Sequence, residues 1–143
     1  MNRSTYPDWD HFIETKQSPY FNSRPEFPML NSDTPTFMGI TKGDSVDDIK
    51  GADAVIIGAP YVATSGEEYM GVSKYEWIAA PKRVRQQSIR YRSGYIQDFD
   101  LDVFEKLNVV DYGDADISSE VMENQSPENI LKAQQAVEQK VLE

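Results

Sequence analysis

A short aliphatic run at residues 54–57 constrains the fold of this 143-residue chain more than any other stretch. The run, AVII, is bounded by Asp53 before it and by Gly58 and Pro60 after it. A continuous apolar run of this length predicts a strand that is buried on both faces, in the middle of a sheet. A second run, LNVV at residues 107–110, predicts another buried strand.

A loop and a helix separate the two predicted strands. Residues 61–80 predict a long loop, and Pro81 then opens a helix that runs to about Tyr91. Proline suits that position because its missing N–H costs nothing in the first turn of a helix. The order strand, loop, helix, strand predicts an α/β fold with a parallel sheet.

The predicted helix is strongly basic, through Lys82, Arg83, Arg85, Arg90 and Arg92. One interpretation is an anion-binding site. The interpretation that we favour is a face whose cations pair with the acidic residues that follow directly, namely Asp98, Asp100, Asp102 and Glu105. A nucleic-acid interface is disfavoured, because phosphate contacts need a basic surface and the net charge of the chain is −10.

Residues 1–35 predict an arm and no regular element. Five of the eight prolines fall there, and their spacing interrupts helical and strand periods alike. Aromatic side chains are uncommon in disordered segments, because they provide the burial that such segments lack. We therefore expect Trp9, Phe12, Tyr20 and Phe21 to be buried against the body of the chain or against a neighbouring subunit. A floppy tail is the alternative.

Residues 36–50 predict short elements that lead into the first strand. Residues 36–40 are interpreted as a short strand or an extended lead-in, and residues 41–43 as a turn. Asp44 or Ser45 then caps a short helix at residues 46–50.

The chain closes on a predicted amphipathic helix. Ser126 caps it and Pro127 takes its first position. Its apolar stripe consists of Ile130, Ala133, Val137 and Val141, widened by Leu131 and Leu142.

Composition excludes several kinds of site. The chain has no cysteine, so disulfide bonds, thiolate metal sites and cysteine nucleophiles are excluded. Its one histidine, His11, lies in the predicted arm and is a poor candidate for a catalytic triad. No stretch reaches the roughly 18 apolar residues that a membrane span needs, and the first residues have no apolar signal region. We therefore expect a cytoplasmic protein without a membrane partner.

The carboxyl ends of the two predicted strands are the expected ligand site. In parallel α/β sheets, ligands bind just beyond these ends. Tyr61, Thr64 and Ser65 follow the first strand and Asp114 follows the second, so these four residues are the candidates for substrate binding. Two structural interpretations stay open: the loop serves subunit packing, and Asp114 serves a turn or a helix cap.

Three motifs in this order resemble the N-terminal part of a ureohydrolase, the superfamily of arginase, agmatinase and guanidinobutyrase. ADAVIIGAPY resembles the family's first strand and turn, APKRVRQQS its GPxxIRxxS helix start, and LDVFEKLNVVDYGDAD its strand and DxGDv turn. The chain departs from the family at Val62, where the family has aspartate, and at Ala80, where it has glycine. The altered approach loop, EEYMGVSKYEWIAAP, is more similar to that of the guanidine-hydrolysing branch than to that of arginase.

The resemblance implies a three-layer, parallel-sheet arginase-like fold of which residues 36–143 supply the first two strands and helices. It implies hydrolysis of a small guanidino compound, agmatine-like or guanidine itself, to urea plus an amine or ammonia. It also implies two divalent metal ions, manganese or nickel, and a homo-oligomer, a trimer or a hexamer.

The family's metal-binding motifs, GGDH, DAHxD and SxDxD, do not occur in this sequence. We therefore expect a truncated gene or a fragment whose metal centre lies beyond these residues, and a chain that is inactive alone. The alternative function is that of a non-enzymatic module, which binds partners through the aromatic arm and the basic helix.

Overall fold

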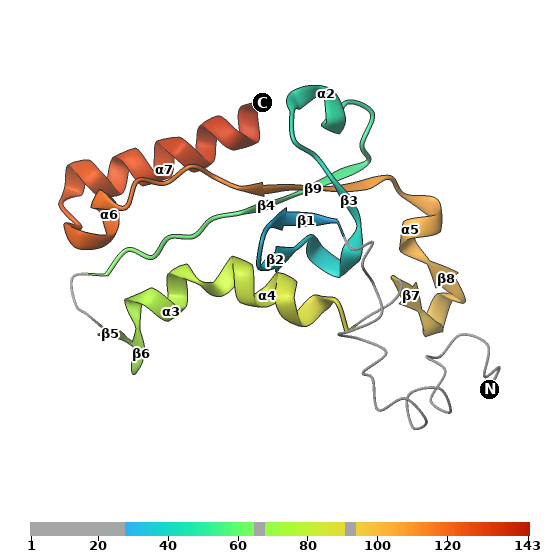
Figure 1. Cartoon of the computed structure of the whole chain (residues 1–143), viewed down its shortest axis with the longest axis horizontal. Coiled ribbons are helices and arrows are strands. Elements are labelled where there is room, and N and C mark those ends of the chain that lie inside the picture. Colours follow the sequence, from blue (N-terminus) through green and yellow to red (C-terminus); the bar gives the residue numbers. More distant parts are fainter. Residues whose placement is uncertain (1–27, 65–67, 91–93) are drawn as a thin grey trace.

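The computed structural model describes residues 28–64, 68–90 and 94–143. Within them the chain forms an α/β fold around a three-stranded parallel sheet (Figure 1). The strands lie in the order β3–β9–β4, with bounds Thr41–Lys42, Val109–Asp114 and Ala54–Gly58. The predicted α/β class with a parallel sheet is confirmed, but the described sheet has one strand more than the two predicted.

Strand β9, and not β4, is the centre of the sheet. β9 pairs with β3 on one side and with β4 on the other, although it follows both in the sequence. Val110 is 1% exposed and Asp111 0%, whereas Ala54 is exposed and Val55 is 36% exposed. The prediction that residues 54–57 are buried on both faces is therefore wrong, because β4 lies at an edge of the described sheet.

Strand β3 occupies residues that were predicted to form a turn. Thr41 pairs with Val110, and Lys42 pairs with Asp111. A strand of two residues is too short to show the period of two from which strands are predicted. The prediction of a turn at residues 41–43 is thus wrong at its first two positions.

Helices lie on both faces of the sheet. Asp111 of β9 bonds to Arg85 of α4 (Ala80–Ser88), while the neighbouring Tyr112 bonds to Glu143, just after α7 (Pro127–Leu142). Because successive side chains of a strand point to opposite faces, α4 and α7 cover opposite faces of the sheet. Figure 1 shows α7 on one side of the strands and α4 on the other.

A hairpin and a 3₁₀ turn precede β3. β1 (Met29–Asn31) and β2 (Thr34–Pro35) pair antiparallel, and η2 (Phe37–Gly39) follows. η2 replaces the strand or extended lead-in predicted at residues 36–40, and β2 and η2 lie against α4. The hairpin falls at the end of the predicted arm, whose prolines suggested no strand. Trp9, Phe12, Tyr20 and Phe21, which we expect to be buried, lie outside the described residues.

The predicted loop at residues 61–80 contains regular structure. β5 (Glu68–Tyr69) and β6 (Val72–Ser73) form a hairpin, and α3 (Lys74–Ile78) follows it. The Ser73 hydroxyl accepts a hydrogen bond from the Tyr75 N–H and caps α3. The sequence signal was a serine followed by a short run without glycine or proline.

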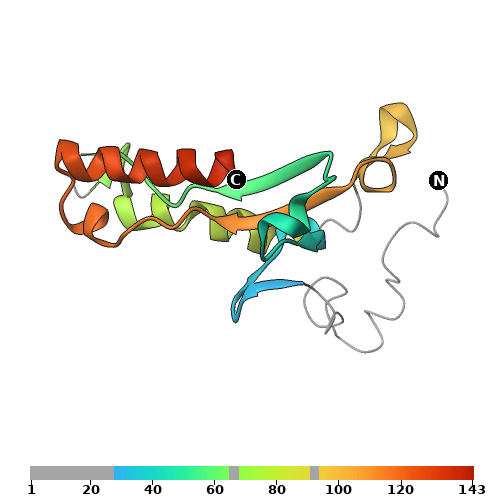
Figure 2. The same cartoon turned by 90° about the horizontal axis from the view of Figure 1, so that it is seen from above.

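The remaining elements lie at the two ends of the fold. Figures 1 and 2 place α5 and the β7–β8 hairpin at the far end of β9 from α6 and α7. Their bounds are Tyr95–Ile96 for β7, Gln97–Phe99 for η3, Leu101–Asp102 for β8, Val103–Lys106 for α5 and Glu120–Glu123 for α6. No helix in the described part of the chain is long and apolar enough to cross a membrane.

Three predicted helix starts are confirmed. Ser45 precedes α2 (Val46–Ile49) and exchanges hydrogen bonds with Asp48. Pro81 lies in the first turn of α4, which ends at Ser88, three residues before the predicted end. Ser126 caps α7 by accepting the Asn129 N–H at 3.2 Å. These starts were predictable because each signal, a capping serine or a first-turn proline, lies within one turn of the helix start.

Candidate functional site

Arg85 of α4 lies at the centre of a buried ion-pair cluster. Its side chain is 3% exposed and grips the Asp111 carboxylate with two parallel hydrogen bonds, Nε to Oδ2 at 2.8 Å and Nη2 to Oδ1 at 2.9 Å. Its Nη1 donates to Asp114 Oδ1 at 2.5 Å, and Nη2 also reaches the Gly113 carbonyl at 3.2 Å. Such two-pronged arginine–carboxylate pairs combine strength with a fixed geometry.

Backbone N–H groups complete the surroundings of Asp111. Phe37 N–H donates to Oδ2 at 2.7 Å, and Gly113 N–H donates to Oδ1 at 3.0 Å. Both carboxylate oxygens are therefore satisfied although the side chain is fully buried. Burial lowers the pKa of Arg85, but the hydrogen bonds to Asp111 and Asp114 outweigh it and hold that pKa above its usual value. The arginine remains charged in the folded protein.

Gly58, the last residue of β4, fits against this cluster because it has no side chain. A Cβ at this position would lie 1.8 Å from Asp114 Oδ1 and 3.0 Å from Arg85 Nη1. The Gly58 carbonyl also accepts the Ala115 N–H at 2.9 Å. The end of β4, the middle of α4 and the end of β9 thus meet at one point.

The Tyr61 side chain lines an apolar cavity beside this cluster. The cavity has a volume of about 370 Å³ and lies between β4 and α4, with Ile56, Trp77, Pro81 and Val84 among its lining residues. The Tyr61 hydroxyl is buried and has no hydrogen-bond partner among the described residues. A bound molecule with one polar group could satisfy it, because a buried hydroxyl without a partner is costly.

The other predicted site residues do not converge on this cavity. Thr64 N–H donates to Gln125 Oε1 at 2.6 Å, and Gln125 Nε2 returns a bond to the Val62 carbonyl at 2.8 Å. Asp114, besides its bond to Arg85, lines a separate cavity of about 220 Å³ with Asp116 and residues of α7. Ser65 lies outside the described residues.

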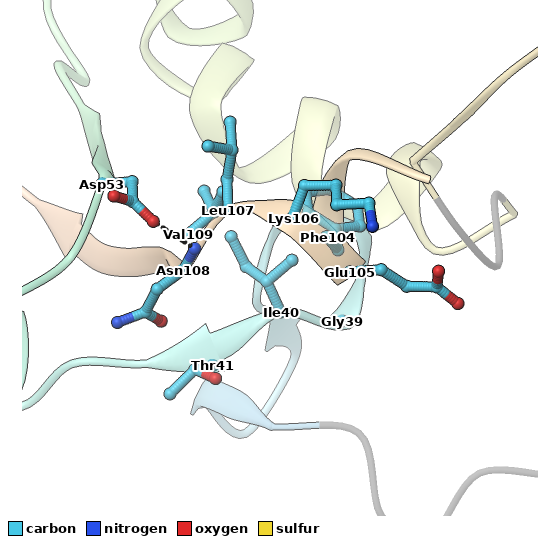
Figure 3. A pocket seen from close by; sticks show the side chains of 10 residues that line it. All are labelled: Gly39, Ile40, Thr41, Asp53, Phe104, Glu105, Lys106, Leu107, Asn108 and Val109. Carbon is cyan, nitrogen blue, oxygen red and sulfur yellow. Dashed lines mark hydrogen bonds between the residues drawn. The ribbon is translucent and has the colours of Figure 1, made fainter. Parts of the chain in front are cut away.

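A larger cavity, of about 560 Å³, opens at the opposite end of the sheet (Figure 3). It lies between Ile40 and Thr41 on one side and residues 104–109 on the other. Asp53, which also lines it, accepts the Asn108 N–H at 2.8 Å and so fixes the start of β9. The cavity was not predicted, and it lies at the amino ends of the strands, away from the usual ligand position in parallel sheets.

The interpretation of the basic helix as a paired face is confirmed for two of its cations, but with other partners. Arg85 pairs with Asp111 and Asp114, and Lys82 pairs with Asp33. The bond from Lys82 lowers the pKa of Asp33. Of the predicted partners, Asp102 instead accepts the N–H groups of Gly94 and of Phe104, the latter in the first turn of α5. Asp100 accepts the Tyr95 hydroxyl.

The described residues do not fit a two-metal centre. No group of three or more histidine, cysteine, aspartate or glutamate side chains in the described part of the chain is placed to hold a metal ion. Asp111 and Asp114 serve as the partners of Arg85. We therefore assign no metal-dependent step to residues 28–64, 68–90 and 94–143.

Comparison of the chain with protein-family models, with curated proteins and with solved structures found no match.

Proposed function

We propose that this chain is the N-terminal part of a ureohydrolase-type amidinohydrolase with an arginase-like fold. In this proposal the complete protein, a homo-oligomer, hydrolyses a small guanidino compound to urea plus an amine or ammonia. The two metal ions, manganese or nickel, are bound by residues outside these 143. The proposal depends on the sequence resemblance, and one structural observation supports it.

That observation is the meeting of the three motifs at Arg85. ADAVIIGAPY contributes Gly58, APKRVRQQS contributes Arg85, and the DYGD turn contributes Asp111 and Asp114. The residue type at each position suits its neighbours in the cluster. Gly58 leaves room for the Asp114 carboxylate, and the guanidinium group of Arg85 matches the geometry of the carboxylates. The three motifs therefore behave as parts of one structural unit, which supports a shared fold more directly than it supports the chemistry.

In the proposed enzyme this chain contributes one wall of the substrate site. Tyr61 and Thr64 follow β4 at its carboxyl end, which is the side on which parallel α/β sheets bind ligands. The cavity beside Tyr61 is lined mainly by apolar side chains and by the already paired Arg85. It suits an uncharged part of a substrate better than a guanidinium group, whose charge needs a free carboxylate.

The test compares two proteins. One is residues 1–143, and the other is the continuous reading frame obtained by reading the gene beyond the codon for Glu143. Both are dialysed, their metal content is measured by elemental analysis, and urea release is assayed with agmatine, arginine, guanidinobutyrate and guanidine in the presence of manganese or nickel. We expect urea release and retained metal only from the longer protein.

Two outcomes contradict the proposal in different ways. Stoichiometric metal and urea release from residues 1–143 would show that the metal centre lies within this chain. A reading frame that ends at Glu143, together with no urea release, would remove the enzymatic function and favour the partner-binding module. That alternative has its own support in an exposed apolar surface on α4, where Val84 is 54% exposed.

A further inference from the structure

An apolar groove runs between η2 and α4. It has a volume of about 590 Å³ and is lined by Phe37, Met38, Arg83, Val84, Gln87 and Ser88. Its surface is almost wholly apolar, and Val84 is 54% exposed. An open apolar groove with a charged residue at its rim is typical of a surface that binds a segment with a large apolar side chain.

The groove is held in place by hydrogen bonds to its backbone. Met38 N–H donates to Ser88 Oγ at 2.7 Å, and Ser88 Oγ donates to the Arg85 carbonyl at 2.8 Å. Met38 has a φ of 50°, in the left-handed region that a non-glycine residue adopts only when its surroundings enforce it. Phe37 N–H is bound by Asp111. The groove is therefore preorganised, which lowers the entropic cost of filling it.

The first 27 residues are attached beside this groove. The Pro28 carbonyl accepts the Thr36 N–H at 2.9 Å, and Phe37, which lines the groove, follows Thr36 directly. A segment tethered this close has a high effective concentration at the groove. With 3.8 Å between consecutive Cα atoms, 27 residues are more than long enough to reach it.

The chemistry of residues 1–27 complements the groove. They include six aromatic residues, of which Trp9 is the largest and stands between Asp8 and Asp10. At the groove, Arg83 is exposed and donates to Gln86 Oε1, and it has no carboxylate partner in the described part of the chain. An indole would fill the apolar surface while a neighbouring carboxylate pairs with the arginine at the rim.

We propose that residues 1–27 dock in this groove of their own chain, with Trp9 on Phe37, Met38 and Val84 and with Asp8 or Asp10 at Arg83. The docked arm covers the exposed face of α4, so that the Val84 side chain is buried within the chain. The proposal does not depend on the ureohydrolase function.

The test uses Trp9 as its own reporter. The chain has two tryptophans, so Trp77→Phe leaves Trp9 as the only one. In this parent protein we expect blue-shifted Trp9 emission and weak quenching by acrylamide. Adding Val84→Asp should shift the emission to longer wavelength and raise the quenching constant towards that of free tryptophan, because the new carboxylate repels the arm. Adding Val84→Ser should do so in part.

Val141→Asp in the same parent is the matched control, because Val141 is also an exposed valine, on α7. It should leave Trp9 protected, and circular dichroism checks that every variant keeps its fold. Strong quenching in the parent, or equal effects of the two aspartate substitutions, would overturn the proposal. Protection that is lost on dilution, together with a dimer in sedimentation, would also overturn it and assign the groove to the arm of a second copy.

Discussion

At the scale of single residues, the Arg85 side chain joins the α4 layer to the sheet. Placing an arginine and an aspartate in the interior costs several kcal/mol of lost hydration, on the order of the attraction between them. Here the geometry repays that cost, because the fork of Arg85 meets both oxygens of Asp111 and two backbone N–H groups complete the shell. Loss of either partner would leave the other charge buried and unpaired.

Arg85→Met is therefore expected to lower the free energy of unfolding by about 3–5 kcal/mol, the usual cost of leaving a buried charge without its partner. The measurement is chemical denaturation followed by circular dichroism. Lys82→Met is the matched control on the same helix, because its pair with Asp33 is exposed and contributes little. Equal losses in the two variants would contradict the central role of the buried cluster.

Gly58→Ala tests the close approach at the same point. The added methyl group would overlap the Asp114 carboxylate, so we expect that carboxylate to move away from Arg85 and the stability to fall by about 1–3 kcal/mol. The control is the same substitution in an Asp114→Ala background, where the carboxylate atoms closest to the new methyl group are gone. If Gly58→Ala costs as much there, the contact with Asp114 is not the reason for the glycine.

Tyr61 and Tyr112 form a second contrast between single residues. The buried Tyr61 hydroxyl lacks a described partner, so Tyr61→Phe should raise the free energy of unfolding by about 1 kcal/mol. Tyr112 donates to Glu143 at 2.8 Å, so Tyr112→Phe should lower stability instead. Thermal denaturation of the two variants decides between the signs, and a stability loss in both would show that the Tyr61 hydroxyl is satisfied in solution.

The contribution of Tyr112 also depends on pH. The bond to Glu143, together with burial, raises the pKa of Tyr112 above its usual value near 10.0. A raised pKa in the folded state means that the stabilisation is complete below pH 10 and is lost as the pH rises through the raised value. The difference in stability between the wild type and Tyr112→Phe should therefore vanish in strongly alkaline solution.

At the scale of elements, β9 organises the described part of the chain. Its successive side chains contact the helices on opposite faces of the sheet, since Asp111 faces Arg85 of α4 and Tyr112 faces α7. The Lys140 ammonium also lies 3.2 Å from the centre of the Tyr112 ring. α7 is thus fixed to the sheet at its C-terminal end, while its first turn is capped by Ser126.

Ser126→Ala should lower stability by about 1 kcal/mol, because the hydroxyl satisfies the Asn129 N–H at the start of α7. Ser119→Ala is the matched control: Ser119 occupies the same position before α6 but makes no side-chain cap bond. Denaturation midpoints of the two variants give the comparison. A loss of similar size in both would mean that the α7 cap is not the source of the effect.

At the scale of the whole molecule, the described chain leaves apolar surface open. β3 and β4 are the edges of the described sheet, and Val141 and Leu142 of α7 are 65% and 73% exposed. Uncovered strand edges and apolar patches favour association. In the proposed enzyme, residues outside these 143 complete the fold and would cover part of this surface.

Residues 1–143 are therefore expected to self-associate at micromolar concentration, which sedimentation velocity measures directly. Replacing Val141 and Leu142 with lysine should reduce the association, because it breaks the apolar end of α7. Replacing the exposed Glu138 and Gln139 with lysine is the control for added charge. A chain that stays monomeric over the whole range would contradict the expectation.

Elements with local signals can be predicted from the amino-acid sequence without knowledge of the tertiary structure. The order of strand, helix and strand, the helix starts at Ser45, Pro81 and Ser126, and hence the α/β class, depend on residues within a few positions of each other. The three motifs were also visible in the sequence, although the contact among them was not. The position of Tyr61 just after a strand predicts a site residue, and the structure adds the cavity that Tyr61 lines.

Which elements and side chains lie next to each other is known only from the tertiary structure. β9, the last strand in the sequence, lies between β3 and β4, so β4 is an edge of the described sheet. The carboxylates that pair with Arg85 lie 26 and 29 residues further along the chain, and not in the acidic segment that follows α4. Periodicity and caps report which face of an element is apolar and where that element starts. Which element covers that face depends on contacts between distant residues, because the free energy of burial rewards whichever arrangement removes most apolar surface from water.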